Sequence, residues 1–285
     1  MTMTAITNQS FANVTSQVRR KLLQTRPLMT GEWQSQDISD KPMLATREIP
    51  NFSFDYKIPS TLKQLVEEVE PNLPWADDHF HERVGGEPLN PPPSNEWWPF
   101  AQKNNAEHKI GEQFSHTYPE RMWPRFANVG GTTDKGRQVF VPHVGIRFEY
   151  GDLQDVVNQL VRGPLTRQAY LPIWFPEDTG AVHGERVPCT LGYHFMIRGD
   201  ELQITYYIRS CDFVRHFRDD VYMACRLADW MAWQVGSRLG NEELTARMLY
   251  MHIVSFHCFE GDVPALELQV KEDDKKLSQR LLGAF

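Results

Sequence analysis

The chain has 285 residues, of which 41% are hydrophobic, 24% charged and 12% aromatic, and this is the composition of a folded globular protein. Its formal net charge of −7 argues against a protein that acts mainly on nucleic acid, because such proteins carry a basic surplus. No apolar run approaches the roughly 18 residues of a membrane helix, and the N-terminal segment lacks the apolar stretch of a secretory signal, so a cytoplasmic protein without a membrane partner is expected.

The first half of the chain predicts few regular elements. A short basic helix is expected over residues 17–24, and a strand over residues 52–58, where FSFDYKI alternates apolar and polar positions. The consecutive prolines 91–93 exclude both helix and central strand and mark a loop. We expect an N-terminal arm over residues 1–25, followed by a single domain over residues 26–285.

The second half predicts a mixture of strands and helices, which is typical of an α/β (α+β) fold. Apolar residues at helical spacing predict helices over residues 153–161, 219–235 and 242–249. Strands are expected over residues 167–174, 192–198, 202–208 and 250–259. The middle two strands flank Gly199–Asp200, which predicts a hairpin, and Asp219 or Asp220 is expected to cap the long helix.

The four cysteines form no CxxC pair, so no metal site is expected, and the cytoplasmic setting predicts free thiols. Cys189 enters the first strand of the predicted hairpin, and Arg209 and Ser210 leave the second, so the three residues should meet at one end of the sheet. The guanidinium and hydroxyl groups can bind one anion, and the positive charge favours a thiolate. From these residues alone, a packed Cys189 and a surface ion pair of Arg209 are the favoured explanation, because a free cysteine is most often a small buried hydrophobic residue.

The order of these residues resembles the thymidylate synthase family. That family has a Pro-Cys nucleophile, a short hairpin, an Arg-Ser-x-Asp motif and then a helix, and here PC, the hairpin and IRSCD are followed by FRDDV. Other segments that resemble the family, in its order, are SHTYPERMWP, GDLQDVVNQL, LTRQAYLPIW and MHIVSFH. The resemblance covers about residues 114–262 and implies a mixed β-sheet with packed helices and a homodimer formed through the sheet face.

The resemblance also implies a set of catalytic residues. Cys189 is the expected nucleophile that adds to C6 of a pyrimidine nucleoside monophosphate, so that C5 can attack the methylene of 5,10-methylenetetrahydrofolate, the implied cofactor. Tyr118 is expected to help remove the C5 proton. The family's catalytic glutamate should lie upstream on a helix, where Glu82 is the first candidate and Asp78 the second.

Four further residues are expected to bind the substrate. Arg209, Ser210 and Arg167 match the residues that hold the 5′-phosphate, and in this family the group at Arg167 comes from the partner subunit. His252 matches the residue that reaches the sugar 3′-hydroxyl. Without the resemblance, a surface charge at Arg167, a core histidine at His252 and an ordinary aromatic anchor at Tyr118 explain these residues equally well.

Departures from the family pattern bear on the substrate. Asp220 stands where thymidylate synthases have asparagine, and Thr190 follows the cysteine where they have histidine. Both features resemble the deoxycytidylate hydroxymethylases of phages, so 5-hydroxymethylation of dCMP or CMP is the expected activity. Val254 replaces a tyrosine that shares the sugar contact with the histidine, so a ribonucleotide substrate is also possible. Gln168 replaces a second arginine of the phosphate site.

Three alternatives remain open at this stage. The enzyme can be a cytidylate methyltransferase, in which the folate also delivers hydride, or a thymidylate synthase acting on dUMP. The third alternative is a non-catalytic relative that binds nucleotide. A purely structural explanation of Asp220 is that it caps the long helix, which aspartate does well.

Overall fold

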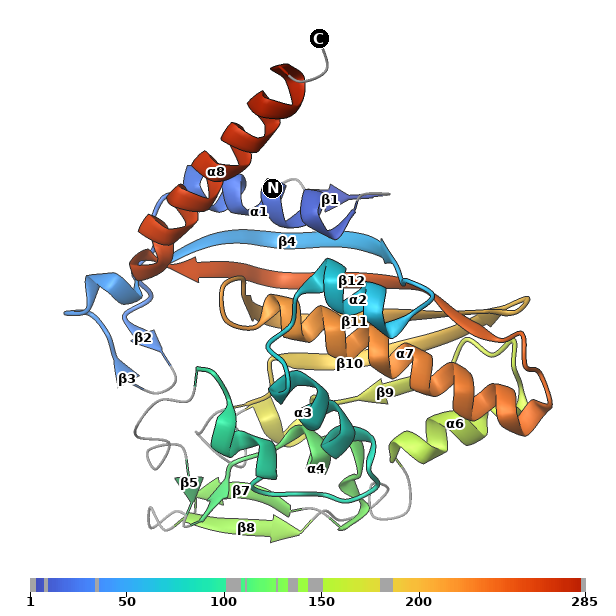
Figure 1. Ribbon diagram of the computed structural model, residues 1–285. Helices are drawn as coiled ribbons and strands as arrows, with labels where there is room; N and C mark the ends of the chain where they lie inside the picture. Colours follow the sequence, from blue (N-terminus) through green and yellow to red (C-terminus); the bar gives the residue numbers. More distant parts are fainter. Residues whose placement is uncertain are drawn as a thin grey trace.

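A mixed six-stranded sheet forms the centre of the computed structural model, in the strand order β1-β4-β12-β11-β10-β9 (Figure 1). The structure describes residues 4–7, 10–33, 36–100, 109–110, 112–126, 128–132, 138–142, 151–179 and 187–282. The strands of this sheet are β1 (Thr4–Ile6), β4 (Thr46–Lys57), β9 (Tyr170–Pro172), β10 (Thr190–Arg198), β11 (Glu201–Asp212) and β12 (Thr245–Phe259). β1 is parallel to β4 and β11 to β12, whereas the other neighbours are antiparallel, so the predicted mixed sheet is confirmed.

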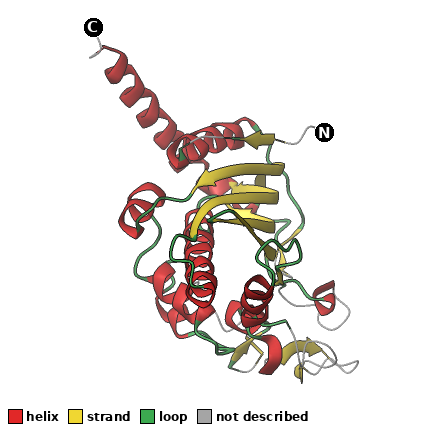
Figure 2. Ribbon diagram, turned by 90° about the vertical axis from the view of Figure 1, so that its right-hand side faces the viewer, coloured by secondary structure: helices red, strands yellow, loops and turns green. Residues whose placement is uncertain are grey.

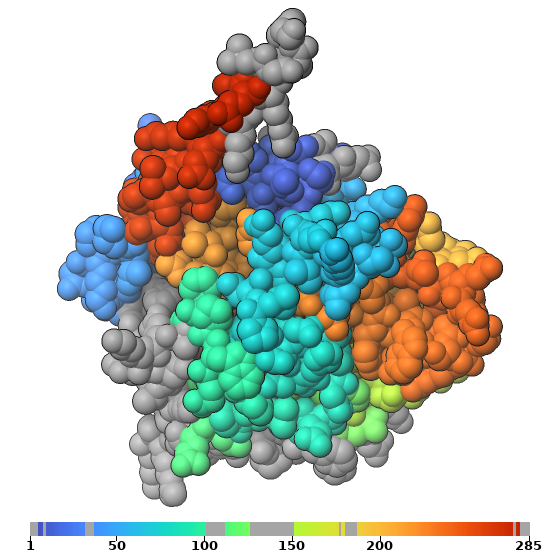
Figure 3. All heavy atoms as spheres, viewed as in Figure 1, coloured from blue at the N-terminus to red at the C-terminus, as the bar shows by residue number. Residues whose placement is uncertain are grey.

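The helices are α1 (Phe11–Gln24), α2 (Leu62–Val69), α3 (Trp75–Val84), α4 (Tyr118–Met122), α6 (Leu153–Arg162), α7 (Phe217–Leu239) and α8 (Val263–Leu282). Of these, α1, α6 and α7 pack against strands of the central sheet, as expected for the fold class. The long helix α7 packs on β11 and β12 and contacts α2, α3 and α6. In the space-filling view these helices hide the sheet from one side (Figure 3).

The remaining strands form small two-stranded sheets, β2 (Glu32–Trp33) with β3 (Gln36–Asp37), β5 (Lys109–Ile110) with β6 (Gln113–Phe114), and β7 (Asn128–Thr132) with β8 (Gln138–Pro142). Short 3₁₀ helices are η1 (Pro42–Leu44), η2 (Pro93–Trp97), η4 (Pro124–Phe126), η5 (Pro176–Thr179) and η6 (Glu260–Asp262). In the described part of the chain, no helix has the length and apolarity needed to span a membrane.

Most of the predicted N-terminal arm lies against the body of the protein. β1 pairs with β4, and one face of α1 is buried in the same apolar cluster as the central strands through Phe11, Val14, Val18 and Leu22. The amphipathic spacing of these four residues explains why the segment docks, because an apolar helix face gains free energy when it leaves water. α8 continues beyond α1 and projects from the body (Figures 1 and 2).

The predicted hairpin is present as β10 and β11, and Gly199 takes the positive φ of 61° that its turn requires. The predicted helix over residues 242–249 is wrong, because β12 already begins at Thr245. Its residues pair with β4 on one side and β11 on the other, so two ladders of backbone hydrogen bonds outweigh the local helical pattern.

The opposite face of the sheet is open over β9 to β12 in the described structure. Large side chains there are partly exposed, with 42% of Tyr170, 37% of Tyr207 and 50% of Val254 accessible. Tyr170 and Tyr207, with Leu191 and His194, line a shallow depression of about 550 Å³.

Candidate active site

The hairpin brings Cys189 and Arg209 together, as its strand pairing predicted. The Arg209 N–H donates to the Cys189 carbonyl oxygen at 2.8 Å. The Arg209 side chain then reaches back, with Nε donating to the Pro188 carbonyl at 2.9 Å and Nη2 to the Val187 carbonyl at 3.1 Å. Cys189 is partly exposed, whereas the other three cysteines are buried. A guanidinium group therefore braces the peptide segment that carries the one accessible thiol.

Tyr118 is linked to Asp220 by a row of hydroxyl groups. Thr190 Oγ1 lies 3.2 Å from the Tyr118 hydroxyl and 2.8 Å from the Tyr206 hydroxyl. Tyr206 donates to Asp220 Oδ1 at 3.4 Å, and the Cys211 thiol donates to Oδ2 at 3.6 Å. Sequence reasoning missed Tyr206, because it lies in an alternating strand and reads as an ordinary core aromatic.

Asp220 does not cap the helix. It is the fourth residue of α7, whose N-cap is His216, and its side chain turns inward to Tyr206 and Cys211. Asp219 is no cap either, since its carboxylate accepts two hydrogen bonds from Asn72. Burial raises the pKa of the Asp220 carboxyl to about 7, even though the positive charge of Arg83 lowers it. Near neutral pH the group therefore exists in both protonation states.

Arg83, on α3, is a second residue that sequence reasoning missed. Its guanidinium carbon lies 4.1 Å from the centre of the Tyr118 ring, and only 4% of the residue is exposed. Nε has no hydrogen-bond partner among the described residues. An arginine beside Glu82 in a charged helix reads as a solvated surface residue, so only the fold reveals a buried cation beside Tyr118.

Glu82 lies on the α3 side of Tyr118. Its carboxylate accepts from the Ser94 N–H at 2.6 Å and the Ser94 hydroxyl, and is 3.0 Å from His79 Nδ1. Burial raises the pKa of Glu82, but the hydrogen bonds from His79 and Ser94 outweigh it and lower the pKa overall. The His79 ring meets the Tyr118 ring edge-on at 6.4 Å. Glu82 is thus one side chain away from Tyr118. Asp78 instead accepts from Trp97 Nε1 at 3.1 Å.

The remaining predicted residues lie toward the open sheet face and the end of β11. His252 Nδ1 is 2.8 Å from the Ser53 hydroxyl, its ring stacks on Tyr207 at 5.3 Å, and burial lowers its pKa. Ser210 follows Arg209 on β11 and pairs with Ser255 of β12. Arg167 is exposed, and its carbonyl oxygen accepts from His194 Nε2 at 3.0 Å.

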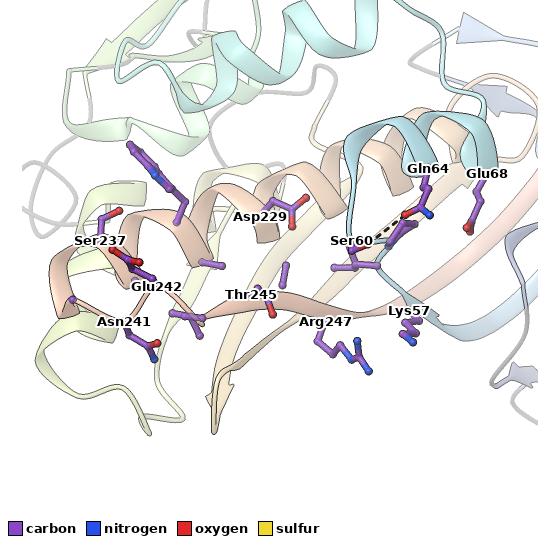
Figure 4. A pocket seen from close by; sticks show the side chains of 18 residues that line it. Lys57, Ser60, Gln64, Glu68, Asp229, Ser237, Asn241, Glu242, Thr245 and Arg247 are labelled. Carbon is purple, nitrogen blue, oxygen red and sulfur yellow. Dashed lines mark hydrogen bonds between the residues drawn. The ribbon is translucent and has the colours of Figure 1, made fainter.

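A separate cavity of about 1000 Å³ lies between α2, the C-terminal half of α7 and the start of β12 (Figure 4). Its polar lining includes Gln64, Glu68, Asp229 and Arg247. It contains none of the predicted site residues. Asp229, the α7 lining residue nearest to Asp220, is nine residues beyond it, about 14 Å along the helix.

Comparison with known proteins gives one family. The sequence profile of the family described as "Thymidylate synthase" matches residues 95–282, a range that contains Tyr118, Cys189 and Asp220 but not Glu82. Members of that family use 5,10-methylenetetrahydrofolate as the one-carbon donor.

Two relatives are both described as putative thymidylate synthases. The protein of Methanococcoides burtonii is 27% identical over 160 residues, which cover 56% of this chain and 60% of the relative. The protein of Methanosarcina acetivorans is 27% identical over 123 residues, covering 43% and 52%. The matches therefore span between half and two thirds of the relatives' length.

Proposed function

The chain belongs to the thymidylate synthase family, and from this premise we propose that it transfers a one-carbon unit from 5,10-methylenetetrahydrofolate to C5 of a cytidine monophosphate, dCMP or CMP. The proposed product is the 5-hydroxymethyl nucleotide. The observation that carries the proposal is the inward-facing carboxyl of Asp220, with its pKa raised to about 7 by burial.

A carboxyl that titrates near pH 7 suits cytosine. Cytosine presents an amino group at C4, which donates, and N3, which accepts. When N3 holds the proton, the Asp220 carboxylate can accept from N3–H and from the amino group, giving two parallel hydrogen bonds, while Tyr206 donates to the same carboxylate. Because N3 of cytosine is basic, the two groups can also share that proton, and a proton on N3 draws electrons from the ring and makes C6 more open to thiolate attack. Uracil has N–H at this position and cannot take the proton.

Cys189 is the proposed nucleophile. Its attack on C6 forms the sulfur–carbon bond and leaves the electron pair on C5, from which the new carbon–carbon bond is made. Arg209 holds the carbonyl oxygens of Pro188 and Val187, so it fixes the segment that presents the thiol. Its positive charge favours the thiolate.

The geometry supports a homodimer in which Arg167 acts in the partner's site. Arg167 lies beside His194 of β10, whereas Arg209 bonds to Cys189. Cys189 precedes His194 by five residues, which is about 17 Å in an extended strand. The Arg209 side chain reaches further still, to Val187. One phosphate held by both guanidinium groups is therefore best explained by two chains that meet through the open sheet face.

An aromatic wall near the start of α7 fits the flat ring of a folate. Trp98 stacks on His216 at 5.4 Å and lies 6.1 Å from Trp75. The indole N–H groups of Trp98 and Trp75 are buried without a hydrogen-bond partner in the described structure. Ring surface and free donors together suit a pterin, which carries acceptor atoms on its edge.

Thymidylate synthesis from dUMP is the second candidate, and the description of both relatives as putative thymidylate synthases favours it. One experiment separates the candidates. The purified protein is incubated with dCMP, CMP or dUMP, each with methylenetetrahydrofolate, and the product is identified by mass. We expect a hydroxymethyl product from a cytidylate and none from the Cys189→Ser control. Conversion of dUMP alone, to a methylated product, would overturn the cytidylate assignment.

A further inference from the structure

A continuous row of oxygen atoms runs from α4 through the sheet to α7. The hydroxyl of Tyr118 is 3.2 Å from Thr190 Oγ1, which is 2.8 Å from the hydroxyl of Tyr206, which in turn is 3.4 Å from Asp220 Oδ1. The two middle residues are 0% and 1% exposed, so bulk water does not reach between them. Thr190 directly follows Cys189, and the row therefore passes beside the proposed nucleophile.

The hydrogen atoms in this row can be counted. Each hydroxyl has a single hydrogen, so a hydroxyl that donates to one neighbour must accept from the other. If Thr190 donated to Tyr118 while Tyr206 donated to Asp220, no hydrogen would lie between Thr190 and Tyr206, and two buried oxygen atoms would face each other at 2.8 Å. Such an unsatisfied buried contact is unfavourable.

The Tyr193 hydroxyl also hydrogen-bonds to Thr190 and Tyr206 from beside the row. Among the four residues of the row itself, two arrangements satisfy every contact. When Asp220 is ionised, the hydrogen bonds run from Tyr118 to Thr190, to Tyr206 and to the carboxylate. When Asp220 carries a proton, all three run in the opposite direction, and Thr190 donates to Tyr118. The protonation state of the carboxyl at one end therefore sets whether the tyrosine at the other end donates or accepts.

We propose that Tyr118, Thr190, Tyr206 and Asp220 form a proton relay between C5 of the bound pyrimidine and the Asp220 carboxylate, with Thr190 and Tyr206 as the positioning residues that connect its ends. The proposal rests on the proposed function. As Tyr118 takes the proton from C5, its own hydrogen passes to Thr190, that of Thr190 to Tyr206, and that of Tyr206 to Asp220. The C5–H bond breaks, its electron pair stays on the carbon, and the carboxylate becomes a carboxylic acid.

The charges around the row are consistent with this direction of transfer. Burial raises the pKa of both Tyr118 and Tyr206 well above 10, so neither holds a lasting negative charge at neutral pH, and each can accept a proton only while it passes one on. Asp220 ends the row with a pKa of about 7. The groups that face its carboxyl are Arg83 from α3, Asp219 from α7, Tyr206 and Cys211 from β11, Tyr193 from β10 and Tyr118 from α4.

The test measures exchange of the C5 hydrogen, which needs nucleotide and Cys189 but no folate. Loss of deuterium from C5 of labelled dCMP to water is followed by NMR for wild type, Thr190→Val and Tyr206→Phe. General acid–base groups contribute about 10²–10⁴-fold, so we expect both variants to slow exchange by at least about tenfold, with dCMP affinity nearly unchanged. Thr190→Ser keeps the hydroxyl and should restore most of the rate.

Tyr222→Phe is the matched control. Tyr222 is also a buried tyrosine whose hydroxyl meets a carboxylate, that of Asp77 at 3.0 Å, but it lies outside the row. This variant should exchange at the wild-type rate. If Thr190→Val fails to fold, Tyr206→Phe still provides the test, because it keeps the ring that stacks on Tyr193 at 4.6 Å.

A second readout distinguishes a relay from a structural role. The exchange rate is measured in mixtures of H₂O and D₂O and plotted against the deuterium fraction of the solvent. The plot is curved when several protons move in the rate-limiting step and straight when only one proton moves. We expect a curve for wild type and a straight line for Thr190→Val. Equal exchange rates in wild type and both variants would overturn the relay. So would a Thr190→Val variant that exchanges more slowly but keeps the curved plot of wild type. If wild type does not exchange the C5 hydrogen of dCMP, CMP or dUMP, the proposed function itself fails and the relay fails with it.

Discussion

Replacing Asp220 with asparagine tests the buried carboxyl directly. Burial shifts its pKa from the ordinary 3.8 to about 7, a difference of about three pKa units. At 1.36 kcal/mol per unit, this corresponds to an upper figure of about 4 kcal/mol by which the folded state disfavours the ionised form. Because the pKa is raised in the folded state, the wild-type protein loses stability as pH rises from about 4 to about 7. Asparagine carries no charge and escapes this loss.

The assay is urea unfolding of wild type and Asp220→Asn between pH 4 and pH 8. We expect similar stability near pH 4 and a growing advantage for the variant, about 1.4 kcal/mol per pH unit at most, that levels off above pH 7. The difference between the two proteins isolates Asp220 from Glu120, whose pKa burial also raises to about 7. Parallel stability curves across this range would show that Asp220 ionises at its ordinary pKa, and the reasoning would be refuted.

Four further predictions concern activity. Asp220→Asn should shift the ratio of kcat/KM for dCMP and dUMP toward dUMP by about ten- to a hundredfold, the equivalent of 1–3 kcal/mol for a mismatched buried polar group; an unchanged ratio would remove Asp220 from base recognition. Cys189→Ser should abolish turnover but keep dCMP binding by calorimetry, and a near-normal rate would exclude the covalent mechanism. Arg209→Ala should weaken dCMP binding by about 1.5–3 kcal/mol for each charge-assisted bond lost, so an unaltered Kd would contradict its phosphate role. Inactive Cys189→Ser and Arg167→Ala proteins, mixed under subunit exchange, should regain activity, and no recovery after demonstrated exchange would argue against a shared site.

The sequence predicted those features of the site that depend on local pattern. The juxtaposition of Cys189 and Arg209 followed from the hairpin, because strand pairing fixes which residues meet. The segment that begins α7 was likewise evident, but its capping residue was not. Asp220 at the fourth helical position looks like a cap in sequence, and only the packing of α7 on β11 turns it inward to Tyr206.

Features that depend on long-range packing were not predictable in the same way. Arg83 lies on a charged segment, and its burial against Tyr118 arises from how α3 meets α4. The residues 242–249 show helical spacing, yet their position between β4 and β11 imposes a strand. The local sequence pattern does not show which distant elements will pack against a segment. Those distant elements determine the burial of Arg83 and the strand conformation of residues 245–249.

The two edges of the sheet restrict how copies of this chain can meet. A long edge strand offers unpaired backbone groups to which another sheet can add without limit, which is a route to polymers. Here β1 and β9 are three residues each in the described structure, and β9 ends in Pro172, which has no N–H to donate. Strand addition onto β1 or β9 therefore finds little backbone to extend. Contact through the open face, by contrast, uses the same surface on both copies and is complete once two chains have met.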